Sequence, residues 1–340
     1  MGERFRQAAL AALLVVLTAA CAGGNGGTTP ASRTPERSPA AGASVTPPPL
    51  TPGSGEGPEP AGRIVFLSFG DGDREIYSVN ADGSDPRNLT RNPGVDENPD
   101  VSPDGKRIAW SSDRGGAVQN IYVMEIDGSN VRQLTFGGGD TSPRWSRDGK
   151  TIAYSLGGSI MVVDAAGGEP RLVMEAENET TAPPCKAGAF PGGWSPDSRR
   201  ITYYSASVSR GIGQVCIVDA ETGKIQIVVD KPAVYNVEPA WSPDGRYLAF
   251  RSIRGGNHDV YVWDLEKGGE RRLTDDPAPD IEPGWSPDGE WIAFPSGRGN
   301  PFFDIFIMRK DGSDARRVTT DPAKDSEPVW VPVLSPAEGP

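Results

Sequence analysis

Trp241-Ser242-Pro243-Asp244-Gly245 is a turn motif that returns intact at Trp285–Gly289. Altered copies stand at Val101–Gly105, Trp145–Gly149 and Trp194–Ser198, and Trp330-Val331-Pro332 keeps only the tryptophan. Serine, proline, aspartate and glycine in this order suit a type I turn, because proline presets φ and glycine tolerates positive φ. Each copy is followed by a short apolar run, so we expect it to join two antiparallel strands. The exception is Ser198, which replaces the glycine and predicts a strained turn.

The motif recurs every 44 to 49 residues, measured between the turn aspartates. Each unit also contains a second apolar run and a second turn, such as Asp127-Gly128, and six of these second turns can be counted. A period in the forties with four strands per unit is typical of a β-propeller. The first unit lacks the strand that enters the motif, and an extra one stands at Glu327–Val331. We therefore predict an all-β, six-bladed β-propeller of four-stranded blades, closed by the C-terminal strand pairing with the N-terminal blade.

The order of short motifs within each unit resembles the repeat of TolB-type propellers. Ser-Pro-Asp-Gly is followed by a run like Leu248-Ala249-Phe250, then by one like Asp304-Ile305-Phe306-Ile307, and then by Asp-Gly-Ser and Leu-Thr. The resemblance extends from about Arg63 to Val331. Full TolB proteins carry an α/β domain ahead of the propeller, and here that place holds a low-complexity segment. The resemblance is therefore to the propeller alone.

The N-terminal segment has the composition of an export signal. Arg4 and Arg6 precede an uncharged apolar run from Ala8 to Ala20, and the stretch ending in Cys21 resembles a bacterial lipobox. We expect a signal peptide at 1–20, a lipid-anchored linker rich in Pro, Gly, Ser and Thr at 21–61, the propeller at 62–334, and a disordered tail at 335–340. Lipidation of Cys21 places the protein outside the cytoplasm, on the bacterial membrane or envelope. Plain secretion is the alternative.

The net charge restricts the kinds of partner that the protein can bind, and the number of cysteines restricts how they can pair. The net charge of −12 opposes binding to nucleic acid. If Cys21 carries lipid, Cys185 and Cys216 remain as an even pair, which forms either a disulfide or two buried thiols. We expect a monomer that meets the membrane only through its lipid.

Few residues suit catalysis. The single histidine, His258, lies in a predicted loop, and zinc sites need clusters of such ligands. The serine of each turn motif has a structural role, and no nucleophile elbow is present. The recurring Arg114, Arg254 and Arg298 are interpreted as structural ion-pair partners, and the recurring tryptophans as packing between blades. We therefore expect no enzymatic activity.

Acidic residues recur before the strand that enters each turn. If this strand is innermost in each blade, as in TolB-like repeats, the carboxylates gather around one mouth of the central tunnel. A cation such as Ca²⁺, basic residues of a partner, or water and counterions would then offset their repulsion. We expect no other cofactor. The candidates are Asp96, Glu97, Asp140, Glu238, Asp280, Glu282, Asp325 and Glu327.

These patterns favour a binding or scaffolding module displayed at the bacterial cell envelope. Its expected partner is an envelope protein or peptide docked at the tunnel mouth. The alternative is an enzyme that processes an envelope polysaccharide or peptide with paired carboxylates as acid and base. Raised pKa values for two such carboxylates would favour this alternative.

Overall fold

The computed structural model describes residues 60–332 except 71, 179, 208–210, 230–233 and 300–301. The chain divides into two units, Met1–Gly53 and Ser54–Pro340, and every described residue belongs to the second. Cys21, the expected signal peptide, most of the linker and the expected tail lie outside the described residues. The domain boundaries therefore remain predictions.

The described residues form strands and turns without helices, so none of them belongs to a helix able to cross a membrane. One four-stranded sheet has the order β24-β1-β2-β3, with bounds Asp325–Trp330, Arg63–Ser68, Glu75–Asn80 and Arg87–Asn88. A second contains β4 (Asp96–Val101), β5 (Arg107–Ser112), β6 (Asn120–Glu125) and β7 (Arg132–Gln133). A third contains β8 (Asp140–Trp145), β9 (Thr151–Leu156), β10 (Ser159–Asp164) and β11 (Arg171–Met174).

The next two groups of strands are joined. The strands β12 (Ala189–Trp194), β13 (Arg200–Ser207), β14 (Ile212–Asp219) and β15 (Ile225–Val229) form the first group. The second contains β16 (Tyr235–Trp241), β17 (Tyr247–Arg254), β18 (Asn257–Asp264) and β19 (Glu270–Arg272). A single parallel residue pair, Gly213 with Tyr235, links them. The last sheet contains β20 (Gly284–Trp285), β21 (Trp291–Ser296), β22 (Asp304–Arg309) and β23 (Arg316–Arg317).

The turn motif adopts the expected geometry. Ser242 Oγ donates to Asp244 Oδ1 at 2.5 Å and accepts from the Tyr247 amide at 2.8 Å, and Gly245 has a φ of 74°. The strain predicted at Ser198 is confirmed, since this residue has a φ of 56°. Its hydroxyl accepts a hydrogen bond from the amide of Asp148 in the neighbouring copy of the motif. The motif therefore orders one hairpin locally and contacts the next.

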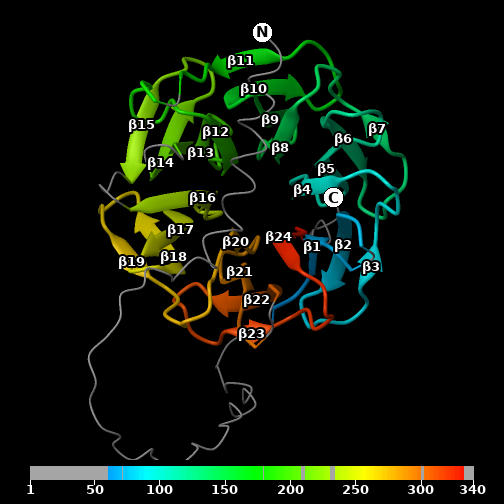
Figure 1. The fold of residues 1–340 in the computed structure, drawn as a ribbon, viewed down its shortest axis with the longest axis vertical. Coiled ribbons are helices and arrows are strands. Elements are labelled where there is room, and N and C mark those ends of the chain that lie inside the picture. The colour runs from blue at the N-terminus through cyan, green and yellow to red at the C-terminus, as the bar shows by residue number, and fades with distance from the viewer. Residues whose placement is uncertain are drawn as a thin grey trace, which may run out of the picture. The chain divides into compact units, whose positions relative to one another are not determined.

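The hydrophobic core is divided among neighbouring sheets. Each of the core clusters in the described residues draws side chains from two successive groups of strands, which follow one another around a common centre in Figure 1. Trp145, Trp194 and Trp241 are 2–4% exposed and lie in three different clusters. Their packing between sheets confirms the role predicted from the repeat, because each indole buries a large apolar area.

The first and last strands of the described chain lie side by side. The antiparallel register joins Ile64 to Trp330 and Ser68 to Asp325, and the red β24 stands beside the blue β1 in Figure 1. The cluster that contains Trp330 also contains Ile64 and Ile305, so the first and last sheets share a core.

The inner strands, β4, β8, β12, β16, β20 and β24, lie nearest the common centre in Figure 1. The register shifts in five of them, between Glu97 and Asp100 in β4 for example. The residue before the inner-strand proline adopts a left-handed conformation, with φ of 48–57°, at Asn98, Ser142, Glu238, Glu282 and Glu327. This conformation is uncommon for residues other than glycine and is typical of a β-bulge.

Candidate functional site

The eight candidate acids do not form one set. Asp96, Asp140, Asp280 and Asp325 stand two residues before the left-handed position and are at most 1% exposed. Glu238, Glu282 and Glu327 stand at the left-handed position itself and are half-buried. Glu97 lies between these two positions and is 7% exposed. The aspartates are therefore buried against the sheets, while Glu238 and Glu327 lie on inner strands and Glu282 stands two residues before β20. We call Glu238, Glu282 and Glu327 the inner-strand glutamates.

Two of the buried aspartates have an arginine partner 18 residues further along the chain. Asp96 Oδ2 lies 2.7 Å from Nη2 of Arg114, and Asp280 Oδ2 lies 2.7 Å from Nη2 of Arg298. Asp96 Oδ1 also accepts from the Trp110 indole at 3.0 Å. The predicted structural role of these arginines is confirmed, because a buried carboxylate requires a partner of opposite charge.

The other two buried aspartates form no ion pair among the described residues. Position 158, which is 18 residues after Asp140, holds a glycine, and the corresponding loop after β1 contains Gly70. Burial raises the pKa of Asp140, and it raises the pKa of Asp325 to about 7. The hydroxyls of Thr319 and Ser68 offset the shift at Asp325 only in part, and neither carboxylate oxygen has a well-formed hydrogen bond. Both carboxyls are therefore buried groups whose charged form is disfavoured, with no described arginine beside them to oppose the shift in pKa.

The inner-strand glutamates are linked to one another through the backbone. The Glu282 amide donates to Glu238 Oε2 at 3.1 Å, and the Glu327 amide donates to Glu282 Oε2 at 2.8 Å. Asn98 continues the series, since its amide donates to Glu327 Oε2 and its side chain donates to Oε1 at 3.0 Å. Each carboxylate thus satisfies an amide that the bulge removes from the sheet ladder.

Proximity and burial change the acidity of this series. Burial raises the pKa of Glu238 to about 7, and the charge of Glu282 adds to the effect of burial while the Arg251 guanidinium opposes it. Burial and the charge of Glu282 raise the pKa of Glu327 to about 8. At neutral pH Glu238 and Glu327 therefore retain protons in part, and a cation placed beside them would displace these protons.

The structure places Arg251 and Tyr204 near Glu238, which the sequence did not predict. Arg251 is 2% exposed and contacts Glu238 Oε1 at 2.9 Å, and Tyr204 stacks on Phe190 with 5.1 Å between ring centroids. Burial raises the pKa of Tyr204, and the charge of Glu238 adds to this effect. Arg251 and Tyr204 occupy equivalent places, because each pairs with the residue four positions before the tryptophan of its inner strand, in β16 and β12 respectively. This register was the only signal that could have identified them.

Glu97 belongs to a different contact network. Its carboxylate lies 2.5 Å from Arg74 Nη1 and accepts from Gln119 at 2.5 Å. It therefore connects loops of neighbouring sheets. No cluster of three or more His, Cys, Asp or Glu side chains among the described residues is arranged to hold a metal ion.

His258 and Arg254 lie on strands. His258 is in β18 rather than in the predicted loop, and burial together with Arg251 lowers its pKa to about 4. Arg254 pairs with Glu270 through two contacts, in place of the aspartate that the other two arginines use. Both residues have structural contacts, as the sequence indicated for the arginine.

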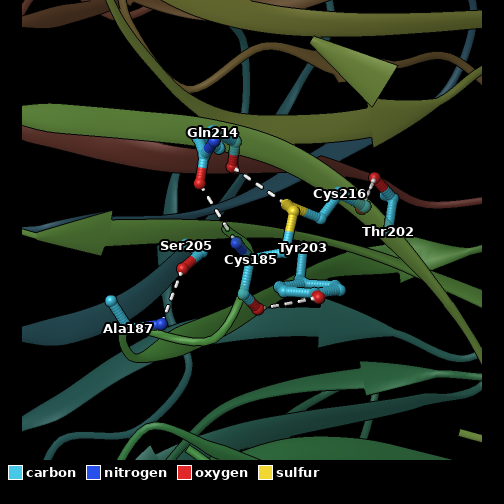
Figure 2. The surroundings of a disulfide bond; sticks show 7 residues. All are labelled: Cys185, Ala187, Thr202, Tyr203, Ser205, Gln214 and Cys216. Atoms are coloured by element: carbon cyan, nitrogen blue, oxygen red, sulfur yellow. Dashed lines mark hydrogen bonds between the residues drawn. A yellow bond between two sulfur atoms is a disulfide. The ribbon is translucent and has the colours of Figure 1, made fainter. Parts of the chain in front are cut away.

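Cys185 and Cys216 are joined by a disulfide, with 6.1 Å between their Cα atoms. Figure 2 shows Gln214, whose side chain accepts from the Cys185 amide at 3.0 Å, and Tyr203, whose hydroxyl donates to the Cys185 carbonyl at 3.0 Å. Both cysteines are fully buried. The disulfide therefore fastens the long connection after β11 to β14, where the sequence had left two thiols as the alternative.

Repeated four-stranded sheets around a common centre, with a bulged inner strand in five of the repeats, define a β-propeller protein. The model of the TolB beta propeller domain matches residues 57–186 and 158–335, and the chain belongs to this family. It is 29% identical over 251 residues to a protein TolB homolog of Chlorobium luteolum. The aligned region covers 74% of this chain and 45% of that relative.

Two further similarities are to a protein named as a peptidase and to a solved structure. The chain is 28% identical over 195 residues to the uncharacterized peptidase YuxL of Bacillus subtilis, covering 55% of this chain and 27% of the relative. The chain thus spans less than half the length of either relative. The crystal structure of TolB from Acinetobacter baumannii superimposes with a TM-score of 0.67 at 21% identity, covering 80% of this chain and 67% of that one. This last similarity concerns the fold.

Proposed function

We propose that this protein is a non-enzymatic binding module of the bacterial cell envelope that docks a cationic segment of a partner protein against the inner-strand glutamates. The observation that carries the proposal is the series of three glutamates on β16, just before β20 and on β24, two of which have raised pKa values. Basic side chains of a partner would replace the protons that these groups hold at neutral pH.

Comparison among the repeats supports a role beyond folding. Asn98 and Ser142 adopt the same left-handed conformation as the glutamates, with φ of 57° and 55°. The bulge therefore does not require a carboxylate. Three neighbouring carboxylates at the bulge repel one another, which costs stability unless a ligand compensates for the charge. Such a cost at one location is typical of binding sites.

The proposed occupant is a peptide segment rather than a metal ion. Each inner-strand glutamate directs one oxygen to an amide of the next strand, which leaves few ligands for a cation that prefers six to eight oxygens. A lysine or arginine needs only one or two acceptors. Binding of Ca²⁺ in place of a peptide is one of the outcomes that the experiment below distinguishes.

A closed ring of six blades would present the glutamates at one tunnel mouth. Pairing of β24 with β1 supports this arrangement, as does the shared core around Trp330 and Ile305. In this arrangement the joined sheet consists of two neighbouring blades, and the pairing of β14 with β16 is a contact between them. A closed ring holds its loops at fixed positions, so a partner would bind with little ordering cost on this side.

Location at the envelope is part of the proposal. The relatives named TolB support it, and the stretch ending in Cys21 suggests that a lipid attaches the protein to a membrane. The Cys21→Ser variant is expected to leave the membrane fraction and appear in the soluble extracytoplasmic fraction. Retention of this variant in the membrane would contradict lipid anchoring.

The experiment is in-cell crosslinking followed by mass spectrometry. We compare the native protein with a variant in which Glu238, Glu282 and Glu327 are changed to glutamine, which preserves their shape and one acceptor oxygen each. A matched control changes the exposed Glu169 and Glu221 to glutamine. We expect a partner that the native and control proteins capture and the folded triple variant does not.

Purified protein then identifies the ligand chemistry. A lysine-rich peptide should raise the melting temperature of the native protein, and more at pH 8 than at pH 5, because Glu238 and Glu327 ionise as the pH rises through this range. A rise with Ca²⁺ alone, absent in the triple variant, would replace the peptide by a metal ion. An unchanged set of crosslinked partners would refute docking at the glutamates.

A second candidate is hydrolysis of an envelope peptide or polysaccharide. The raised pKa values of Glu238 and Glu327 favour it, as does the similarity to a protein named as a peptidase. Turnover of a peptidoglycan fragment or a casein substrate by the purified protein, lost in Glu327→Gln, would support this candidate. Absence of turnover with both substrates is the result that our first proposal expects.

A further inference from the structure

Among the described residues the outermost strand of each repeat pairs on one side only, and five of these edges share two features. The strands β3, β7, β11, β19 and β23 are two to four residues long, and each contains at least one arginine. Short length and positive charge are the usual means by which proteins prevent an exposed edge from pairing with another chain.

The sixth outer strand, β15, has neither feature. It runs for five residues, Ile225–Val229, with the sequence Ile-Gln-Ile-Val-Val and no charged side chain. Within the described residues it pairs only with β14, and it lies at the periphery in Figure 1. Gln226 is exposed and Ile227 is 40% exposed. Uncharged, β-branched edges of this kind are templates for strand addition.

From this difference we infer that β15 is a second binding surface, which accepts an extended segment of another protein by β-strand addition. The backbone of β15 would supply the hydrogen bonds, and Ile227 would contact an apolar side chain of the added strand. This surface is at the periphery and does not depend on the inner-strand glutamates.

Charge decides between the possible occupants. Two copies of this chain would each carry a net charge of −12, and their repulsion opposes self-pairing along one short strand. A five-residue edge also buries too little area to hold two large domains together. A partner segment of alternating β-branched residues without acidic side chains meets neither obstacle. We therefore assign the edge to a neutral or basic extended segment of a different protein.

The test uses a defined probe and three variants. The probe is a peptide of alternating threonine and valine with a lysine at each end and blocked termini. Its binding is followed by amide hydrogen exchange of residues 225–229 and by fluorescence anisotropy of a labelled peptide. Ile227→Lys should weaken binding about tenfold or more, since charge on an edge prevents pairing. Ile227→Thr keeps β-propensity without charge and should bind within about threefold of the native protein.

The matched control is Val118→Lys, which adds the same charge at a side chain that is 46% exposed in the loop after β5. It should bind the peptide as the native protein does. Protection of 225–229 that Ile227→Lys abolishes supports the inference. An absence of protection in the native protein, or equal weakening by Val118→Lys, overturns it. Concentration-dependent dimerisation without peptide, abolished by Ile227→Lys, overturns the choice of occupant.

Discussion

Replacing Glu327 by glutamine should stabilise the protein at alkaline pH while leaving it unchanged at acidic pH. The carboxylate has a pKa of about 8 because burial and the charge of Glu282 disfavour its ionised form. Glutamine keeps an oxygen that can accept from the Asn98 amide, so the bulge on the next strand retains its hydrogen bond. The substitution therefore removes the charge and preserves the hydrogen bond to the Asn98 amide, while the Asn98 side chain loses its acceptor at Oε1.

The sign follows from proton linkage. An unfolded glutamate has a pKa near 4.5, so between pH 4.5 and 8 the folded state holds a proton that the unfolded state releases. The contribution of Glu327 to stability is thus present at low pH and falls as the pH rises through this window. At about 1.4 kcal/mol per pKa unit, the loss between pH 5 and pH 8 is on the order of 3 kcal/mol.

Thermal unfolding at a series of pH values measures this effect. In a protein of this size, about 3 kcal/mol corresponds to roughly 6–12 °C in the melting temperature. We expect Glu327→Gln to melt higher than the native protein at pH 8 and at the same temperature at pH 5. The control Glu221→Gln removes an exposed charge and should reproduce the native pH profile. Equal pH profiles for the native protein and Glu327→Gln would refute the reasoning.

Three other predictions concern the contacts that hold the sheets. Ending the chain at Lys324 removes β24, and a lost or broadened melting transition is expected; an unchanged transition would contradict closure by this strand. Changing Cys185 and Cys216 to alanine should cost about 3–4 kcal/mol in denaturant unfolding, because the disulfide closes a 31-residue separation. Arg114→Ala should cost about 3–5 kcal/mol by leaving Asp96 charged and buried, and Asp96→Asn added to it should restore part of the loss.

Short-range patterns predicted much of the fold. The turn at Ser242–Gly245 depends on φ preferences and side-chain acceptors within a few residues, and these act in any fold. The packing of Trp145 and Trp194 followed from their equivalent places in the repeat. The sequence predicted that Arg114 and Arg298 form structural ion pairs, but it did not predict which acidic residues are their partners. An interval of 18 residues from aspartate to arginine, common to both pairs, was an available signal.

The sequence did not predict which of the candidate acidic residues are buried in the sheets and which are half-buried. Asp325 and Glu327 are two residues apart, and the strand period of two places them on the same face. The left-handed conformation of Glu327 breaks this alternation, so Asp325 is buried in the sheet while Glu327 is half-buried and reaches the next inner strand. A bulge of this kind depends on pairing with β1, which is more than 250 residues away in the sequence.

The sequence by itself determined the repeat, the turns, the four-strand units and the membership of a propeller family, because these follow from local conformational preferences repeated in phase. Only the tertiary structure decided which carboxylates hold protons, which of them reach the next strand, and that Ile225–Val229 is an uncharged outer edge. The physical reason is that burial, charge proximity and free edges depend on neighbours from distant parts of the chain.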